Sequence, residues 1–133
     1  MQDIISLYRN YPKYDNLHDL DLQHHIKPSI FLNQYKKHYH NDKLVGFTNW
    51  AYLSDYAFNH FKQTAKINYK EWNSGTNLVF VEFIAIKNVR KIFKWCVDMA
   101  KKFKGIKDNF TWLRVEDNQI KRMVVKDIEW VDL

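Results

Sequence analysis

The stretch Leu78-Val-Phe-Val-Glu-Phe-Ile-Ala-Ile86 decides the fold, because eight of its nine residues are apolar. An apolar run of this length predicts a strand that is buried on both faces of a sheet. Glu82 stands in its middle, although an ionised carboxylate taken out of water is costly unless it is paired or hydrogen-bonded. The sequence therefore marks Glu82 as either a structural oddity or a functional group.

Helix and strand patterns lie on both sides of this run. Apolar residues at helical spacing predict a helix over 89–104, which Gly105 ends, and a helix that starts at the capping residue Ser54. A helix between one strand and the next predicts a parallel crossover. The expected fold class is α/β, a mixed β-sheet covered by helices in one domain over residues 1–133. The other expected elements are a short helix over 2–9 with Asp3 as its cap, and strands over 29–39, 44–53, 110–115 and 120–125, with turns at 40–43, 72–75 and 116–119 and a short apolar end through Trp130 and Val131.

Composition narrows the classes of protein. The 133 residues are 46% hydrophobic, which is enough for one core. The one cysteine, Cys96, excludes an intramolecular disulfide and is expected in the core. No segment is apolar enough to span a membrane, so a cytoplasmic protein without membrane insertion is expected. The formal charge of +6 favours an anionic partner, which includes nucleic acid, a membrane surface or an acidic protein.

Five histidines are candidates for site residues. Residues 10–27 lack a regular pattern and are expected to form a functional loop, which carries His18, His24 and His25. Histidine is the side chain best suited to act as a base near neutral pH. His38 and His40 share one strand face, but a zinc site needs a third ligand, so we expect no metal and two solvent-facing histidines.

Four short motifs follow one another along the chain. They are Asn33-Gln-Tyr35; Val45-Gly-Phe-Thr-Asn-Trp-Ala-Tyr-Leu-Ser54; Trp72-Asn-Ser-Gly75 with Phe80-Val-Glu-Phe-Ile-Ala85; and Leu113-Arg-Val115. In their order and approximate spacing they resemble the RTX toxin-activating lysine acyltransferases of the hemolysin-activating type. The resemblance extends from about His18 to Val125 and implies an acetyltransferase-like (GNAT) fold.

The resemblance implies transfer of a fatty acyl group from acyl carrier protein, without a bound cofactor, to internal lysines of a protoxin or peptide precursor. It also implies that His18 and Glu82 are the catalytic pair, although the family has an aspartate where this chain has Glu82. His24 and His25 stay alternatives to His18. Lys87-Asn-Val-Arg90 holds no glycine, and a carrier-bound donor explains this better than coenzyme A, whose pyrophosphate binds a glycine-rich loop. The residues implied in binding substrate or carrier are Arg114, Trp72, Ser74, Gly75 and Asn33.

Acyl transfer to lysine needs a base, because a free lysine has a pKa of about 10.4 and is protonated at neutral pH. A carboxylate such as Glu82 can orient a histidine base and stabilise its charged form. For Glu82 and Arg114, the alternative is a purely structural role at a sheet edge or in an ion pair. For the whole protein, the alternatives are a nucleic-acid-binding module and an inactive homologue that binds a partner. The change from aspartate to glutamate keeps the inactive homologue open. The lysines of 87–107 either solubilise a helix or attract an acidic carrier. A homodimer is compatible with the sequence.

Overall fold

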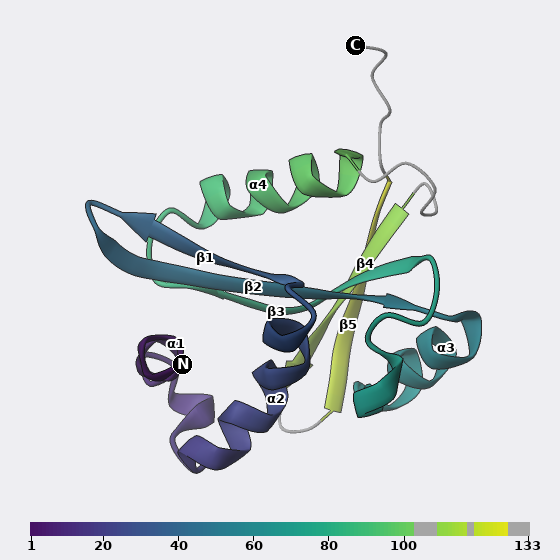
Figure 1. Ribbon diagram of the computed structural model, residues 1–133, viewed down its shortest axis with the longest axis horizontal. Helices are drawn as coiled ribbons and strands as arrows, with labels where there is room; N and C mark the ends of the chain where they lie inside the picture. Colours follow the sequence, from purple (N-terminus) through teal and green to yellow (C-terminus); the bar gives the residue numbers. More distant parts are fainter. Residues whose placement is uncertain (103–108, 117–118, 128–133) are drawn as a thin grey trace.

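The computed structural model describes residues 1–102, 109–116 and 119–127. Within these ranges, five strands form one sheet and four α-helices accompany it (Figure 1). The elements are α1 (Gln2–Tyr8), the 3₁₀ helix η1 (Pro12–Tyr14), α2 (Asp19–Phe31), β1 (Tyr35–His40), β2 (Lys43–Leu53), α3 (Asp55–Thr64), the 3₁₀ helix η2 (Tyr69–Glu71), β3 (Asn77–Ala85), α4 (Val89–Lys102), β4 (Asn109–Glu116) and β5 (Gln119–Asp127).

The sheet is mixed, with the strand order β1-β2-β3-β4-β5. Neighbouring strands are antiparallel except β3 and β4, which are parallel. Two parallel strands that follow each other in the chain require a crossover from one end of the sheet to the other. Helix α4 lies between β3 and β4 in the chain and belongs to this crossover. The α/β fold class, the mixed sheet and the crossover after β3 are thus confirmed.

Helices cover both faces of the sheet. Helix α4 lies on one face, and α1, α2 and α3 lie on the other (Figure 1). The cluster on the α4 face contains Trp50, Leu78, Phe80, Cys96, Met99 and Ala100. The opposite face holds two clusters, one with α3 around Phe61 and Val79, and one with α1 and α2 around Phe47 and Ile84. A strand buried between two helical layers explains why the run 78–86 is almost wholly apolar.

The expectation of a loop over 10–27 and a strand from Ser29 is wrong, because residues 19–31 form α2. Leu22 and Ile26 are four residues apart and both are fully buried, so one helical face packs on the sheet. Pro28 lies inside this helix although it has no N–H to donate. Tertiary packing of the apolar face therefore outweighs the weak local helix signal, and β1 begins only at Tyr35.

The predicted turn and cap between β1 and α3 are confirmed. Asn41 and Asp42 both have positive φ angles, 49° and 64°, as a tight two-residue hairpin turn requires. Ser54 caps α3, since its hydroxyl accepts a hydrogen bond from the N–H of Ala57 at 3.1 Å. Gly105 and the apolar end at Trp130 and Val131 lie outside the described residues.

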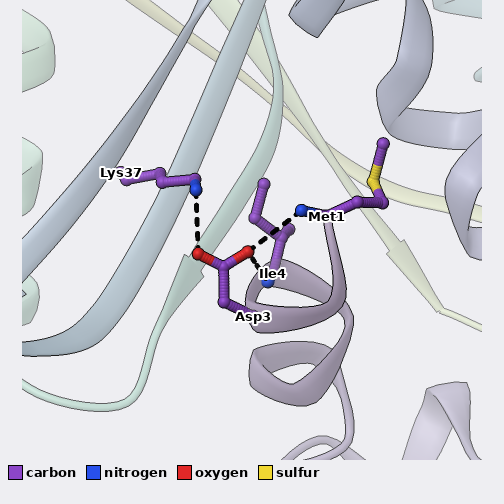
Figure 2. A network of polar contacts seen from close by, with 4 residues as sticks. All are labelled: Met1, Asp3, Ile4 and Lys37. Atoms are coloured by element: carbon purple, nitrogen blue, oxygen red, sulfur yellow. Dashed lines mark hydrogen bonds and ion pairs between the residues drawn. The ribbon is translucent and has the colours of Figure 1, made fainter.

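Asp3 fastens α1 to the edge of the sheet, and Figure 2 shows its contacts. Its carboxylate accepts hydrogen bonds from Lys37 of β1 at 2.8 Å, from the Ile4 N–H at 2.8 Å and from the Met1 amine at 3.2 Å. The hydrogen bond from Lys37 lowers the pKa of Asp3 to about 2. Asp3 lies within the first turn, and Met1 is the N-cap residue, so the expected capping role is wrong.

Candidate active site

A β-bulge in β3 sets the direction of Glu82. Strand β2 pairs Asn49 with Glu82 but pairs its next residue with Phe80, so Val81 is an extra residue in β3. Without this insertion, the two-residue period of a strand would point Glu82 to the same side as Phe80, toward α4. Beyond the bulge, Ile84 packs with α1 and α2, and Glu82 shares this side. Bulges are common next to active sites, where they re-aim a side chain.

Three tyrosines at a spacing of three residues bring the N-terminal segment onto this end of β3. The Tyr11 hydroxyl donates to the Ala85 carbonyl at 2.7 Å and accepts from the Ala85 N–H at 3.1 Å. Burial and the nearby Glu82 carboxylate raise the pKa of Tyr14 well above its ordinary value, so the Tyr14 phenol lies close to this charge. Burial and the same carboxylate raise the pKa of Tyr8, whose buried hydroxyl has no hydrogen-bond partner within the described ranges.

Asn49 supports the bulge from β2. Its side chain is fully buried, and its Oδ1 accepts a hydrogen bond from the backbone N–H of Glu82 at 2.8 Å. Its Nδ2 donates to the Ser29 hydroxyl of α2 at 3.0 Å, and Ser29 in turn donates to the Ile26 carbonyl at 2.7 Å. An N–H that is removed from water needs an acceptor. Asn49 provides this acceptor for the Glu82 N–H at the bulge and connects the bulge to α2 through Ser29.

His18 is the N-cap residue of α2 and is exposed. The preceding residue, Leu17, packs against the α1 and α2 cluster, which lies on the same face of the sheet as Glu82. His24 and His25 lie further along α2 and are also exposed. An open depression of about 620 Å³ at His18 is lined by Arg9, Asp15, Leu17, His18, Asp19 and Leu20. The two predicted catalytic residues therefore share one side of the sheet, and their roles remain predictions.

Gln34 joins the first three motifs in space. Its side chain is buried, and its Nε2 donates to the Trp50 carbonyl at 3.0 Å and to the Trp72 carbonyl at 3.1 Å. One residue of the first motif thus joins the main chains of the second and third. Asn33 precedes it with a φ angle of 56°, a left-handed conformation that asparagine tolerates where a helix ends.

The turn from Trp72 to Gly75 is fixed by the end of β2 and the start of α3. The Ser74 hydroxyl accepts a hydrogen bond from the N–H of Ser54 at 3.0 Å. A Cβ on Gly75 would lie 2.5 Å from a main-chain oxygen of β2, so the turn requires glycine. The Trp72 side chain is buried and borders a second depression of about 390 Å³. These contacts give the motif a structural role, and the binding roles of Asn33, Trp72, Ser74 and Gly75 remain predictions.

Arg114 lies where β3 and β4 have separated. In the described strands, parallel pairing joins Leu78–Phe80 to Phe110–Trp112 and stops there. The β4–β5 hairpin then crosses away from β3 (Figure 1). Arg114 pairs with Arg122 of β5 in this diverging part, and Glu82 lies on the corresponding part of β3. The backbone therefore places both residues just beyond the end of the pairing, while the carrier-binding role of Arg114 remains a prediction.

Comparison with known families identifies the chain. Residues 1–128 match the model of the RTX toxin acyltransferase family. The chain belongs to this family. It is therefore an acyltransferase, and the resemblance carried by the four motifs is confirmed. No curated protein matches the chain significantly. Among the described helices of this acyltransferase, none is both long and apolar enough to cross a membrane.

The expectation that His38 faces solvent is wrong. Helix α4 covers this face of β1, so His38 is only 8% exposed and its ring meets Trp95 edge-on at 5.2 Å between centroids. Its Nε2 lies 2.8 Å from the Thr48 hydroxyl, and burial lowers the pKa of His38 to about 4. His40 is half-buried. Cys96 is in the core as predicted, and burial raises the pKa of its thiol to about 12, which makes a thiolate nucleophile unfavourable.

Sequence reasoning on this acyltransferase missed Asn49, which supports Glu82, and Gln34, which joins the first three motifs. Both residues lie inside those motifs, so the motifs themselves were the available signal. Tyr8 and Tyr14 carry a weaker signal, the three-residue spacing of the tyrosines in this segment. Arg9, which contacts the segment around His18, has no local pattern that distinguishes it from a surface arginine.

Proposed function

We propose that this acyltransferase moves a fatty acyl group from acyl carrier protein to the ε-amine of an internal lysine in a protoxin or peptide precursor, in the cytoplasm. The observation that carries the proposal is the direction of Glu82 within a chain that matches the family over residues 1–128. The bulge turns this carboxylate away from α4 and toward the face on which His18 begins α2.

The proposed reaction needs a deprotonated lysine amine as nucleophile and a carrier thiol as leaving group. His18 acts as the base that removes a proton from the target lysine, because an ammonium has no lone pair with which to attack. The free amine attacks the thioester carbonyl, the C–S bond breaks, and the carrier thiol leaves with a proton while an amide forms. Glu82 orients His18 or shares its proton, and the hydrogen bond from its own N–H to Asn49 holds the backbone that directs the carboxylate.

The carrier side of the reaction is assigned to the basic surface. Lys91, Lys94 and Lys102 of α4 are exposed on the side away from the core, and the whole chain carries a formal charge of +6. Such a surface attracts an acidic carrier protein and speeds its encounter. Arginine binds phosphate through two parallel hydrogen bonds, which suits Arg114 for the phosphate of the carrier's phosphopantetheine arm. No other cofactor enters the proposal.

Mass spectrometry of a candidate protoxin after incubation with loaded carrier protein tests the proposal. We expect a mass increment of one acyl chain on lysine, its loss in His18→Ala and Glu82→Gln, and its retention in the matched controls His24→Ala and His25→Ala. Acyl coenzyme A in place of the carrier should give no product. An absent increment with the wild-type chain, or an unchanged one in both site variants, would refute the proposal; binding of the protoxin without any increment would indicate an inactive homologue.

The structure gives no support to the alternative of a nucleic-acid-binding module. Recognition of single strands on a sheet requires exposed aromatic side chains on which bases stack. Phe47, Trp50 and Phe80 of the central strands are at most 6% exposed because helices cover both faces of the sheet, whereas Tyr39 is 58% exposed on the edge strand β1. A salt-dependent shift with DNA or RNA is therefore not expected.

A further inference from the structure

The guanidinium of Arg9 joins three points of the segment that leads into α2. Its Nη1 donates to the Tyr14 carbonyl at 2.8 Å. Its Nη2 donates to the Leu17 carbonyl at 2.8 Å and to the Asp19 carboxylate at 2.6 Å. His18 lies between the last two residues. One side chain thus holds the main chain before His18 and the side chain after it.

These contacts restrict geometry more than they add stability. The Arg9 side chain is 34% exposed and the Asp19 side chain 53% exposed, and an ion pair this exposed contributes little to folding. The other two acceptors are main-chain carbonyls, so removal of the guanidinium frees the backbone on the N-terminal side of His18. A lysine carries a single ammonium and lacks the planar fork needed to reach acceptors in these directions.

The same contacts relate His18 to Glu82. Arg9 holds the carbonyl of Tyr14, whose ring packs against the cluster that includes Ile84 of β3, and the Glu82 charge lies close enough to raise the pKa of Tyr14. Tyr11 of the same segment exchanges two hydrogen bonds with the main chain of Ala85, so the segment is fixed to both the guanidinium and β3. Leu17, also held by Arg9, packs into the cluster that includes Ile84. The segment around His18 is fixed relative to this end of β3.

We infer that Arg9 is a positioning residue for acyl transfer, which holds His18 in place relative to Glu82. This inference rests on the proposed function, in which His18 is the base. Arg9 borders the same depression as His18, but its guanidinium is bonded to the segment at Tyr14, Leu17 and Asp19, so it acts through that segment. Displacement of a catalytic group by about 1 Å costs on the order of 100-fold in rate, so loss of Arg9 should affect kcat and leave substrate binding intact.

The test measures kcat and KM for loaded carrier and for the protoxin in Arg9→Ala, Arg9→Lys and His18→Ala. Lys62→Ala, which removes one positive charge from α3, is the matched control. We expect kcat of Arg9→Ala to fall by roughly 10- to 100-fold with both KM values within twofold of wild type and the melting temperature nearly unchanged. Arg9→Lys should recover little of this loss. Amide hydrogen exchange should accelerate at residues 15–18 and stay unchanged in β3.

Three results overturn the inference, and they separate it from the proposed function. If His18→Ala is inactive but Arg9→Ala keeps wild-type kcat, Arg9 does not position His18 and the proposed function stands. Full recovery in Arg9→Lys would mean that only the charge matters, which also contradicts the inference. If His18→Ala stays fully active, the assignment of the base is wrong and the role of Arg9 is refuted with it, whatever the rate of Arg9→Ala.

Discussion

Replacement of Asn49 by alanine should destabilise the protein and impair acyl transfer together. The partly buried Glu82 N–H would lose its acceptor at 2.8 Å, and an unsatisfied donor that water does not reach costs about 1–3 kcal/mol. The small void left by truncation brings the expected loss of unfolding free energy to about 2–4 kcal/mol. Because Asn49 holds the bulge that directs Glu82, the acylation rate should also fall.

Asn77→Ala is the matched control at the opposite end of β3. Asn77 is 5% exposed, and its Nδ2 donates to the Leu53 carbonyl at 2.9 Å and to the Asp55 carboxylate at 2.8 Å. Its loss removes the donor of the buried Leu53 carbonyl and leaves a small void, so the expected destabilisation is similar, on the order of 2–4 kcal/mol. Asn77 lies far along β3 from Glu82, so the acylation rate of the folded variant should stay near that of the wild type.

Urea unfolding and acylation assays separate the two effects. With a slope of about 2 kcal/mol per molar urea, each midpoint should fall by roughly 1–2 M. Rates are compared by mass spectrometry at a temperature where both variants are folded. An Asn49→Ala midpoint equal to that of the wild type would refute the role of the hydrogen bond. Equal loss of rate in both variants would show that the bulge has no specific influence on the site.

Three further changes test other parts of the structure. His38→Gln should flatten the pH dependence of stability. In the wild type, the unfolded chain takes up a proton at His38 below about pH 6.5 and the folded chain only near pH 4, so the free energy of unfolding decreases as the pH is lowered from about 6.5 to 4. Urea midpoints at several pH values measure this difference. Tyr11→Phe should cost about 1–2 kcal/mol and speed hydrogen exchange at the Ala85 amide, whose acceptor it removes. Gly75→Ala should lower the melting temperature by the equivalent of roughly 1–3 kcal/mol, because its Cβ would lie 2.6 Å from the Ser54 nitrogen; a higher melting temperature would contradict this reading.

Periodicity predicted most of the sheet and the helices that cover it, because those elements carry strong local patterns. The strand at 78–86 and the helix from Val89 differ from the structure by one or two residues at the described ends. Helix α2 was not predictable in the same way. Its buried side chains, Leu22 and Ile26 among them, are separated by histidines, and Pro28 favours a break. Such a helix is stable because its apolar face meets the sheet, and local sequence does not contain that contact.

The candidate site was only partly predictable, for a related reason. Glu82 was visible as a charge within an apolar run, which one sequence suffices to show. The direction of its side chain was not, since the bulge at Val81 is a property of the register between two strands and no glycine marks it. Arg9 could not be found because two of its three acceptors are main-chain carbonyls, and every residue has one.

The placement of Glu82 accounts for its presence in an apolar strand. A half-buried carboxylate is costly unless polar groups face it, and the phenols of Tyr8 and Tyr14 lie close enough for the Glu82 charge, together with burial, to raise both pKa values. A tyrosine with its ordinary pKa of about 10 is already protonated at neutral pH, so both phenols present a neutral O–H group near the carboxylate. The segment that leads to His18 therefore lies beside the carboxylate, and Arg9 holds the main chain of that segment at Tyr14 and Leu17. The surroundings of Glu82 thus come from this segment as well as from the strand, which accounts for a charged residue in an otherwise apolar run.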